Sequence, residues 1–212
     1  MNIKKLPKSW SKLTLGQFIQ LRELHMTNDN IHNLVSKLSV LSGIEPDIIY
    51  TTVRSKDIAK IYKRINFLDS MPKKKEFQNF TWKGRYYKRL EAEKTTNSQV
   101  TDILSLNDDV QNEGERILNV LSVIYYRGNE SKYSGDRYKT MRELFLNLPM
   151  DLAFNASSFF LSGLSQYFPN VLEGFSKKIK SMKLNQIKEL RLKVRKLPNG
   201  NELEKYINGI IG

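Results

Sequence analysis

Aromatic and basic side chains alternate within one short stretch near the middle of the chain. Aromatic rings can stack on nucleobases, and neighbouring cations can pair with phosphates. Strands are also rich in aromatic residues for packing reasons alone. We therefore favour a strand pair whose rings pack on helices with the basic side chains outside, and keep nucleic-acid contact and edge-strand addition to a neighbouring subunit as alternatives. The candidate contact residues are Trp82, Lys83, Arg85, Tyr86, Lys88 and Arg89.

A second basic cluster lies close to the end of the sequence. Residues 177–196 include nine basic residues and a single acid, Glu189. Apolar residues recur there at helical spacing, which predicts a basic amphipathic helix. We expect it to contact DNA, an acidic protein or a partner helix rather than a membrane, because its apolar face lacks Trp and Phe anchors. The candidate residues are Lys183, Lys188, Arg191, Arg195 and Lys196.

Residues with catalytic potential are few and scattered. His25 and His32 are seven positions apart with a polar turn between them, and two histidines alone form a poor metal site. The chain contains no cysteine and no phosphate-binding, zinc-protease or serine-hydrolase motif. No pair of carboxylates suggests acid–base chemistry. The sequence therefore predicts that the protein is not an enzyme and holds no cofactor or metal.

The charge of the whole chain is strongly positive. Its 212 residues carry a formal net charge of +13, and 40% of them are hydrophobic, which suffices for a packed core. Such a charge favours a polyanion or an acidic protein as partner, although a lysine-coated surface also serves solubility. The absence of cysteine fits maturation in a reducing cytoplasm. The richest apolar stretch, 152–168, is too polar to span a bilayer, so no membrane association is expected.

Helix signals organise the first part of the chain. Thr14 and Gln17 have the spacing of a capping box and predict a helix that reaches Met26. A second helix is expected from about Ile31 to Ser42, where Gly43 ends it. A third helical region is expected from Pro46 to about Phe67, and Lys83-Gly84 then predicts the turn of a short β-hairpin.

The opening signal returns after the hairpin. Thr96 and Gln99 repeat the Thr-x-x-Gln start 82 positions after Thr14 and Gln17. Further on, residues 121–124 (LSVI) echo residues 38–41 (LSVL). The ordered matches indicate an internal duplication; the alternative is two ordinary amphipathic helix pairs that coincide.

The segment from Tyr125 to Tyr138 is polar and rich in tyrosine, and we expect a loop there. A more apolar helical region follows, divided at Pro149. The expected fold is mainly α: a helical bundle of two related halves linked by a short β-hairpin, with a basic C-terminal amphipathic helix. The expected divisions are a first half at 1–70, the hairpin at 71–94, a second half at 95–175 and the tail at 176–212.

Several stretches together carry a family resemblance: residues 10–19 (WSKLTLGQFI), 38–43 (LSVLSG), the strand pair before the second Thr-x-x-Gln, 121–127 (LSVIYYR) and the helix at 149–160. In these stretches, which cover about the first 165 residues, the chain resembles the small helical virion-associated proteins of tailed phages, particularly the crAss-like phages. Family members have Gly-Gln-aromatic in the second copy, where this chain has Ser98-Gln99-Val100. The basic tail lies outside the resemblance.

What the resemblance implies is a structural protein of the virion, made in the host bacterial cytoplasm. Its expected place is a ring of identical subunits in the tail or the head–tail connector, in contact with other tail, portal or connector proteins. The hairpin and the tail helix are the expected contacts between subunits, with DNA as a further candidate partner. The alternatives are a DNA-binding capsid or packaging accessory protein and a tail assembly chaperone.

Overall fold

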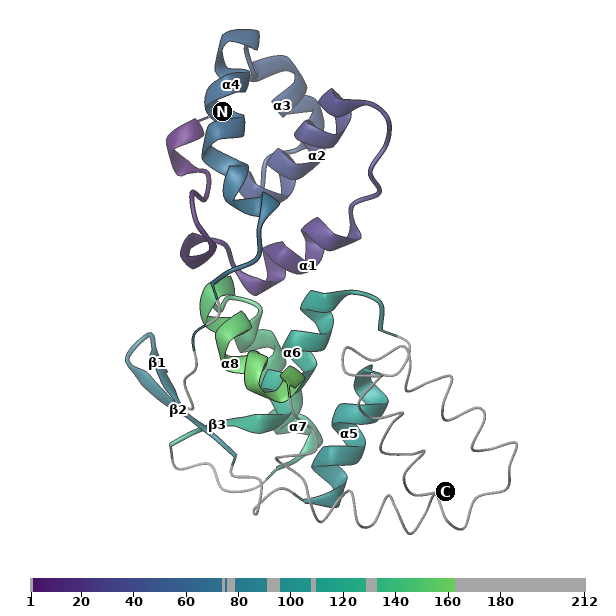
Figure 1. The fold of residues 1–212 in the computed structure, drawn as a ribbon, viewed down its shortest axis with the longest axis vertical. Helices are drawn as coiled ribbons and strands as arrows, with labels where there is room; N and C mark the ends of the chain where they lie inside the picture. Colours follow the sequence, from purple (N-terminus) through teal and green to yellow (C-terminus); the bar gives the residue numbers. More distant parts are fainter. Residues whose placement is uncertain are drawn as a thin grey trace, which may run out of the picture.

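The computed structural model describes residues 2–73, 75, 79–90, 96–107, 110–128 and 133–162. This part of the chain is mostly helical and includes one small antiparallel sheet, as expected for a mainly α fold. Figure 1 shows two lobes stacked along the long axis. The N-terminal lobe contains α1–α4, and the C-terminal lobe contains α5–α8 and the sheet. The predictions for residues 163–212, including the basic tail helix, concern residues outside the described ranges.

The N-terminal lobe begins at the predicted capping box. The hydroxyl of Thr14 accepts from the Gln17 backbone N–H at 3.1 Å, and the Gln17 side chain accepts from the Thr14 backbone N–H at 3.1 Å. The second predicted signal is also confirmed, because Gly43 ends α2 with a left-handed φ of 68°. The helices are α1 (Leu15–Glu23), α2 (Asn30–Ser42), α3 (Pro46–Thr52) and α4 (Ser55–Ile65), with 3-10 turns at Ile3–Lys5, Trp10–Lys12 and Asn66–Asp69.

One predicted helix limit in this lobe was wrong, and one predicted helical region is divided. Helix α1 ends at Glu23 and not at Met26, because a turn competes with it: the Asn33 side chain accepts from the Thr27 N–H at 2.9 Å and donates to the Thr27 carbonyl at 2.7 Å. The region from Pro46 to about Phe67 is helical as expected, but an extended backbone at Val53–Arg54 divides it into α3 and α4.

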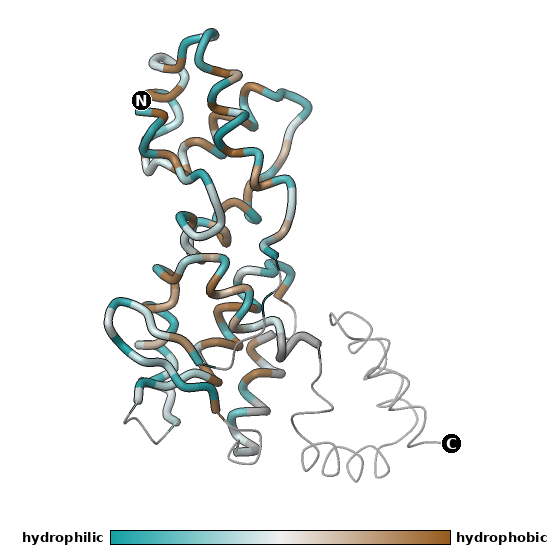
Figure 2. The backbone as a smooth tube through the Cα atoms, turned by 60° about the vertical axis from the view of Figure 1, so that its left-hand side comes forward, coloured by the Kyte–Doolittle hydropathy of each residue, from teal (hydrophilic) through white to brown (hydrophobic). Residues whose placement is uncertain are grey.

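The C-terminal lobe is built around α6 (Glu113–Ile124). This helix packs against α1, α5 (Asn97–Asn107), α7 (Gly135–Phe145) and α8 (Met150–Ser162). Every residue from Ile117 to Ile124 is buried, so α6 has no solvent face over that length. In Figure 2, the hydrophobic residues recur along the helices of both lobes, as expected for helices that share a core. Among the described residues, no helix has the length and apolar character to cross a bilayer.

The sheet has one strand more than the predicted hairpin. Strand β1 (Phe80–Trp82) pairs with β2 (Arg85–Arg89), and β2 pairs in turn with β3 (Tyr125–Arg127), giving the antiparallel order β1-β2-β3. The loop expected from Tyr125 to Tyr138 is therefore wrong at both ends. Tyr125 is fully buried in the strand that follows α6, and Ser134 caps α7, which begins at Gly135.

Backbone hydrogen bonds join the two lobes. The first N–H groups of α1, which have no partner within that helix, donate to the turn between α7 and α8: Leu15 to the Leu148 carbonyl and Gly16 to the Leu146 carbonyl, both at 2.8 Å. In return, the Met150 N–H at the start of α8 donates to the Leu13 carbonyl at 2.8 Å. A Cβ atom on Gly16 would lie 3.1 Å from the Leu146 carbonyl oxygen, so glycine permits this close approach.

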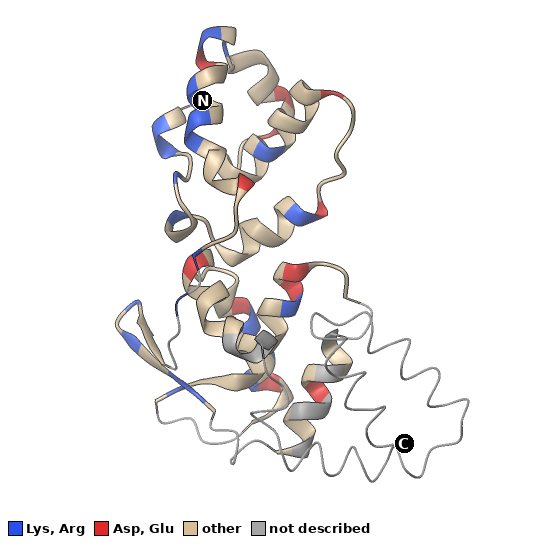
Figure 3. Cartoon of the chain, viewed as in Figure 1, with Lys and Arg blue, Asp and Glu red and all other residues tan. Residues whose placement is uncertain are grey.

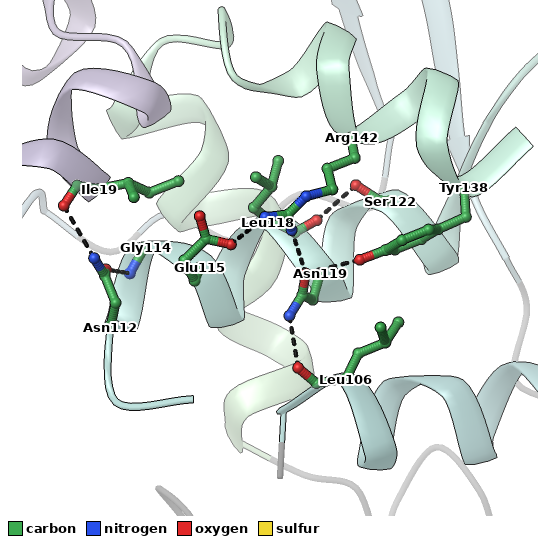
Figure 4. Close-up of polar contacts among 10 residues, drawn as sticks. All are labelled: Ile19, Leu106, Asn112, Gly114, Glu115, Leu118, Asn119, Ser122, Tyr138 and Arg142. Atoms are coloured by element: carbon green, nitrogen blue, oxygen red, sulfur yellow. Dashed lines mark hydrogen bonds and ion pairs between the residues drawn. The ribbon is translucent and has the colours of Figure 1, made fainter. Parts of the chain in front are cut away.

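Helix α1 also packs tightly against the start of α6. The Asn112 side chain caps α6 by accepting from the Gly114 N–H at 2.9 Å, and it donates to the Ile19 carbonyl of α1 at 3.0 Å (Figure 4). A Cβ atom on Gly114 would lie 2.7 Å from Ile19 Cγ1 and 3.0 Å from Phe18 Cδ1. The two helices can therefore meet at this distance only where α6 has no side chain.

Candidate interaction surface on the β-sheet

The tight turn between β1 and β2 follows directly from its sequence. Lys83 and Gly84 both have positive φ, 48° and 70°, as a type I′ turn requires at its two central positions. This turn sets the register in which Trp82 lies opposite Arg85. The Lys83 ammonium lies 4.7 Å from the centre of the Trp82 ring, a cation–π contact at the tip of the hairpin.

The register gives the sheet an inner face that anchors it to the helices. Phe80, Tyr87 and Tyr125 share this face and are buried. The Phe80 ring lies 5.1 Å from Tyr87 and 4.9 Å from Tyr125, and Tyr87 lies 5.5 Å from Phe145 of α7. These distances are typical of packed aromatic pairs. Burial raises the pKa of Tyr125 against the opposing effect of the nearby Arg89.

The outer face of the sheet has a different composition. Strand alternation places Tyr86 and Lys88 of β2 on the side opposite Tyr87. The register then adds Thr81, across from Tyr86, and Tyr126, across from Lys88. Tyr86 is 50% exposed, whereas Lys88 and Tyr126 are partly buried. We call these four residues, Thr81, Tyr86, Lys88 and Tyr126, the outer face.

All the charged side chains of the sheet and its turn are positive. Figure 3 shows blue and no red along β1 and β2. Five cations therefore lie on the three short strands and on the turn between β1 and β2, and the strands themselves contain no Asp or Glu. They are Lys83, Arg85, Lys88, Arg89 and Arg127.

The structure brings the predicted hairpin residues together but divides them between environments. Lys83, Arg85 and Tyr86 are exposed, whereas Trp82, Lys88 and Arg89 are partly buried. The rings of Phe80 and Tyr87 pack inward, as expected for a strand pair on helices, whereas the ring of Tyr86 faces solvent. The predicted contact residues of the tail, Lys183, Lys188, Arg191, Arg195 and Lys196, lie outside the described residues.

Strand β3 and the place of Tyr126 in the sheet were not predicted from the sequence, which indicated a loop there. Tyr125-Tyr126-Arg127 has the aromatic character of a strand, but three residues form a strand only when a neighbour pairs with them. That neighbour is β2, almost 40 positions earlier in the chain. The only local sequence signal for this strand was therefore the aromatic pair Tyr125-Tyr126.

A buried polar network in the C-terminal lobe was also missed. Asn119 of α6 is 4% exposed; its side chain donates to the Leu106 carbonyl at 2.8 Å and accepts from the Tyr138 hydroxyl at 2.9 Å (Figure 4). Arg142 donates to Asn119 and forms an ion pair with Glu115. Burial alone would lower the pKa of Arg142. The hydrogen bond and the negative charge of Glu115 have a larger effect in the opposite direction, so the pKa of Arg142 is raised. The network ties α5 and α7 to α6.

The histidines lie away from the sheet. An open depression between the end of α1 and the start of α6 has His25 on its wall, beside an ion pair of 3.2 Å between Arg22 and Glu113. His32 lies on the exposed first turn of α2. No group of three or more His, Cys, Asp or Glu side chains suited to a metal ion occurs within the described ranges.

No protein-family model matches the chain, and neither a curated protein nor a solved structure matches it significantly.

Proposed function

We propose that the protein is a structural subunit of a tailed-phage particle, assembled as a ring in the tail or the head–tail connector. The observation that carries the proposal is a sheet attached to a helical body in which, among the described residues, β1 is an edge strand. Within the described residues, β1 pairs only with β2. Figure 1 shows the β1–β2 turn projecting from the C-terminal lobe. An open edge strand is a template for pairing with another chain, and head-to-tail pairing of identical subunits closes into a ring when the rotation allows.

The backbone of Thr81 is the part of β1 that offers this pairing. In a two-residue hairpin, the pair next to the turn, Trp82 and Arg85, exchanges hydrogen bonds, and the following pair, Thr81 and Tyr86, does not. The Tyr86 carbonyl instead accepts from the Gly128 N–H at 3.3 Å, toward β3. The N–H and carbonyl of Thr81 are therefore directed to the open edge.

We also propose that the two lobes descend from one duplicated helix pair. The second Thr-x-x-Gln forms the same reciprocal contacts as the first: the Thr96 N–H donates to the Gln99 side chain at 2.9 Å, and the Gln99 N–H donates to the Thr96 hydroxyl at 3.4 Å. The echoed residues Leu38 and Leu121 are both completely buried. A duplicated unit with the hairpin between its copies accounts for both similarities.

Replacing Thr81 with proline tests the role of the edge. Proline removes the outward N–H and leaves the hydrogen bonds between β1 and β2 in place. We expect the wild-type chain, alone or mixed with its neighbouring virion proteins, to sediment as a discrete high-order oligomer, and Thr81→Pro to shift it to smaller species. Thr81→Val keeps the N–H and should assemble as the wild type does. A wild-type chain that stays monomeric in both settings would contradict the ring.

Mass spectrometry of purified particles tests the virion role independently. A structural subunit is present in finished particles in a fixed ratio to the other ring proteins. A chain abundant in infected cells and missing from particles would instead be an assembly chaperone, and the proposal would be wrong.

A further inference from the structure

We propose that the outer face of the sheet binds single-stranded nucleic acid, by stacking unpaired bases on Tyr86 and Tyr126 while the surrounding cations pair with phosphates. This inference is independent of ring assembly, because it concerns the broad face of the sheet and not the open edge of β1.

The geometry of the outer face suits two adjacent bases. Tyr86 lies on β2, and Tyr126 lies on the neighbouring β3 across from Lys88, which is two residues along β2 from Tyr86. The two rings are therefore diagonal neighbours on one surface, separated by roughly 7–8 Å between the strand positions that carry them. Consecutive bases of a single strand can occupy such a pair of rings.

The opposite face makes this surface rigid. Phe80 and Tyr87 pack against Phe145 of α7, and Tyr125 packs against Phe80, so the sheet is held on α7. In addition, the Tyr125 hydroxyl donates to the Ala156 carbonyl of α8 at 3.3 Å. A platform whose underside is packed loses little conformational freedom when a ligand binds its upper side.

The charge of the sheet complements a phosphate backbone. Lys83 and Arg85 are exposed at the tip, Lys88 lies on the outer face, and the sheet carries no carboxylate. An acidic protein would also be attracted to these cations, whereas an unpaired base can in addition stack on the Tyr86 ring, which is 50% exposed beside them. A DNA duplex hides its base faces, so it could use the cations and not the tyrosines.

Fluorescence anisotropy with labelled oligonucleotides tests the inference on the full-length protein. The probes are a thymidine oligonucleotide, its RNA equivalent and a duplex of equal length, each titrated at several salt concentrations. We expect Tyr86→Ala to weaken binding of both single strands about tenfold, which corresponds to about 1.4 kcal/mol, and to leave duplex binding unchanged. Tyr86→Phe keeps the ring and should bind as the wild type does.

Tyr62 provides the matched control. It is 48% exposed on α4, beside the exposed Lys63, and it is remote in sequence from the sheet. Tyr62→Ala should leave the affinity for single strands unchanged, and both alanine variants should melt at the wild-type temperature because each ring is half exposed. A third variant, Arg85→Ala, removes a cation that is exposed at the tip and should reduce the salt dependence of single-strand binding by about 0.7 in log–log slope.

Three results would overturn the proposal. They are an absence of single-strand binding by the wild type at low salt, equal losses from Tyr86→Ala and Tyr62→Ala, and an affinity for duplex that falls with Tyr86→Ala as much as the affinity for single strands. The ratio of the DNA and RNA affinities identifies which single strand the face prefers.

Discussion

The absence of a Cβ atom at Gly114 determines how closely α1 approaches α6. Gly114 lies where any side chain would meet Ile19 and Phe18, and both of these are buried in the common core. Gly135, at the first position of α7, has no atom within 4 Å of the place its Cβ would take. The same substitution at these two glycines should therefore have opposite effects.

We expect Gly114→Ala to lower the free energy of unfolding by about 1–3 kcal/mol, because the added methyl must displace buried side chains in a packed interface. Gly135→Ala should leave stability unchanged or raise it by about 0.4–1 kcal/mol, since it restricts the unfolded chain without a clash. Urea denaturation followed by circular dichroism measures both. Equal destabilisation by the two substitutions would show that the close contact between α1 and α6 is not limiting.

At the scale of elements, the type I′ turn determines how β1 meets β2. Gly84 and Gly128 both have open space where a Cβ would lie, but only Gly84 has a positive φ, 70°. A comparison of the two glycines thus separates backbone conformation from steric contact.

Gly84→Ala should destabilise the protein by about 1–2 kcal/mol, the cost of placing an ordinary L-residue in the left-handed region. Gly128→Ala should change stability by less than about 0.5 kcal/mol. Thermal melts of the two variants check this prediction. A neutral Gly84→Ala would mean that the hairpin contributes nothing to the measured unfolding transition.

Local residues predicted some elements and could not predict others. Both Thr-x-x-Gln starts, the stop at Gly43 and the turn at Lys83-Gly84 follow from side chains within a few positions of each other. Strand β3 could not be predicted in this way, because Tyr126 belongs to a sheet only through its pairing with Lys88. Two residues of the outer face, Tyr86 and Lys88, were therefore predicted from the sequence as candidate contact residues. Tyr126 could be assigned to this face only from the structure.

For the molecule as a whole, the division into two lobes does not imply two independent folding units. Helix α1 belongs to the N-terminal lobe, yet it packs on α6 and donates backbone hydrogen bonds to the turn before α8. Its loss would leave the start of α6 and that turn without partners. The lobes should therefore stabilise each other.

We expect the full chain to unfold in a single cooperative transition, with a calorimetric enthalpy equal to the van't Hoff enthalpy. Gly114→Ala should shift that one transition to lower temperature without splitting it. Differential scanning calorimetry measures both quantities. Two resolved transitions in the wild type would indicate that the junction between α1 and α6 couples the lobes only weakly.

The hydrogen bonds between α1 and the turn before α8 also have a consequence for synthesis on the ribosome. The carbonyls that receive the Leu15 and Gly16 N–H groups belong to Leu148 and Leu146, so they are translated some 130 residues later. At elongation rates of about 5–20 residues per second this interval is roughly 7–26 s. During that time the nascent N-terminal lobe lacks the partners of α1, and it is then that a chaperone or a neighbouring subunit can reach the apolar side of this helix.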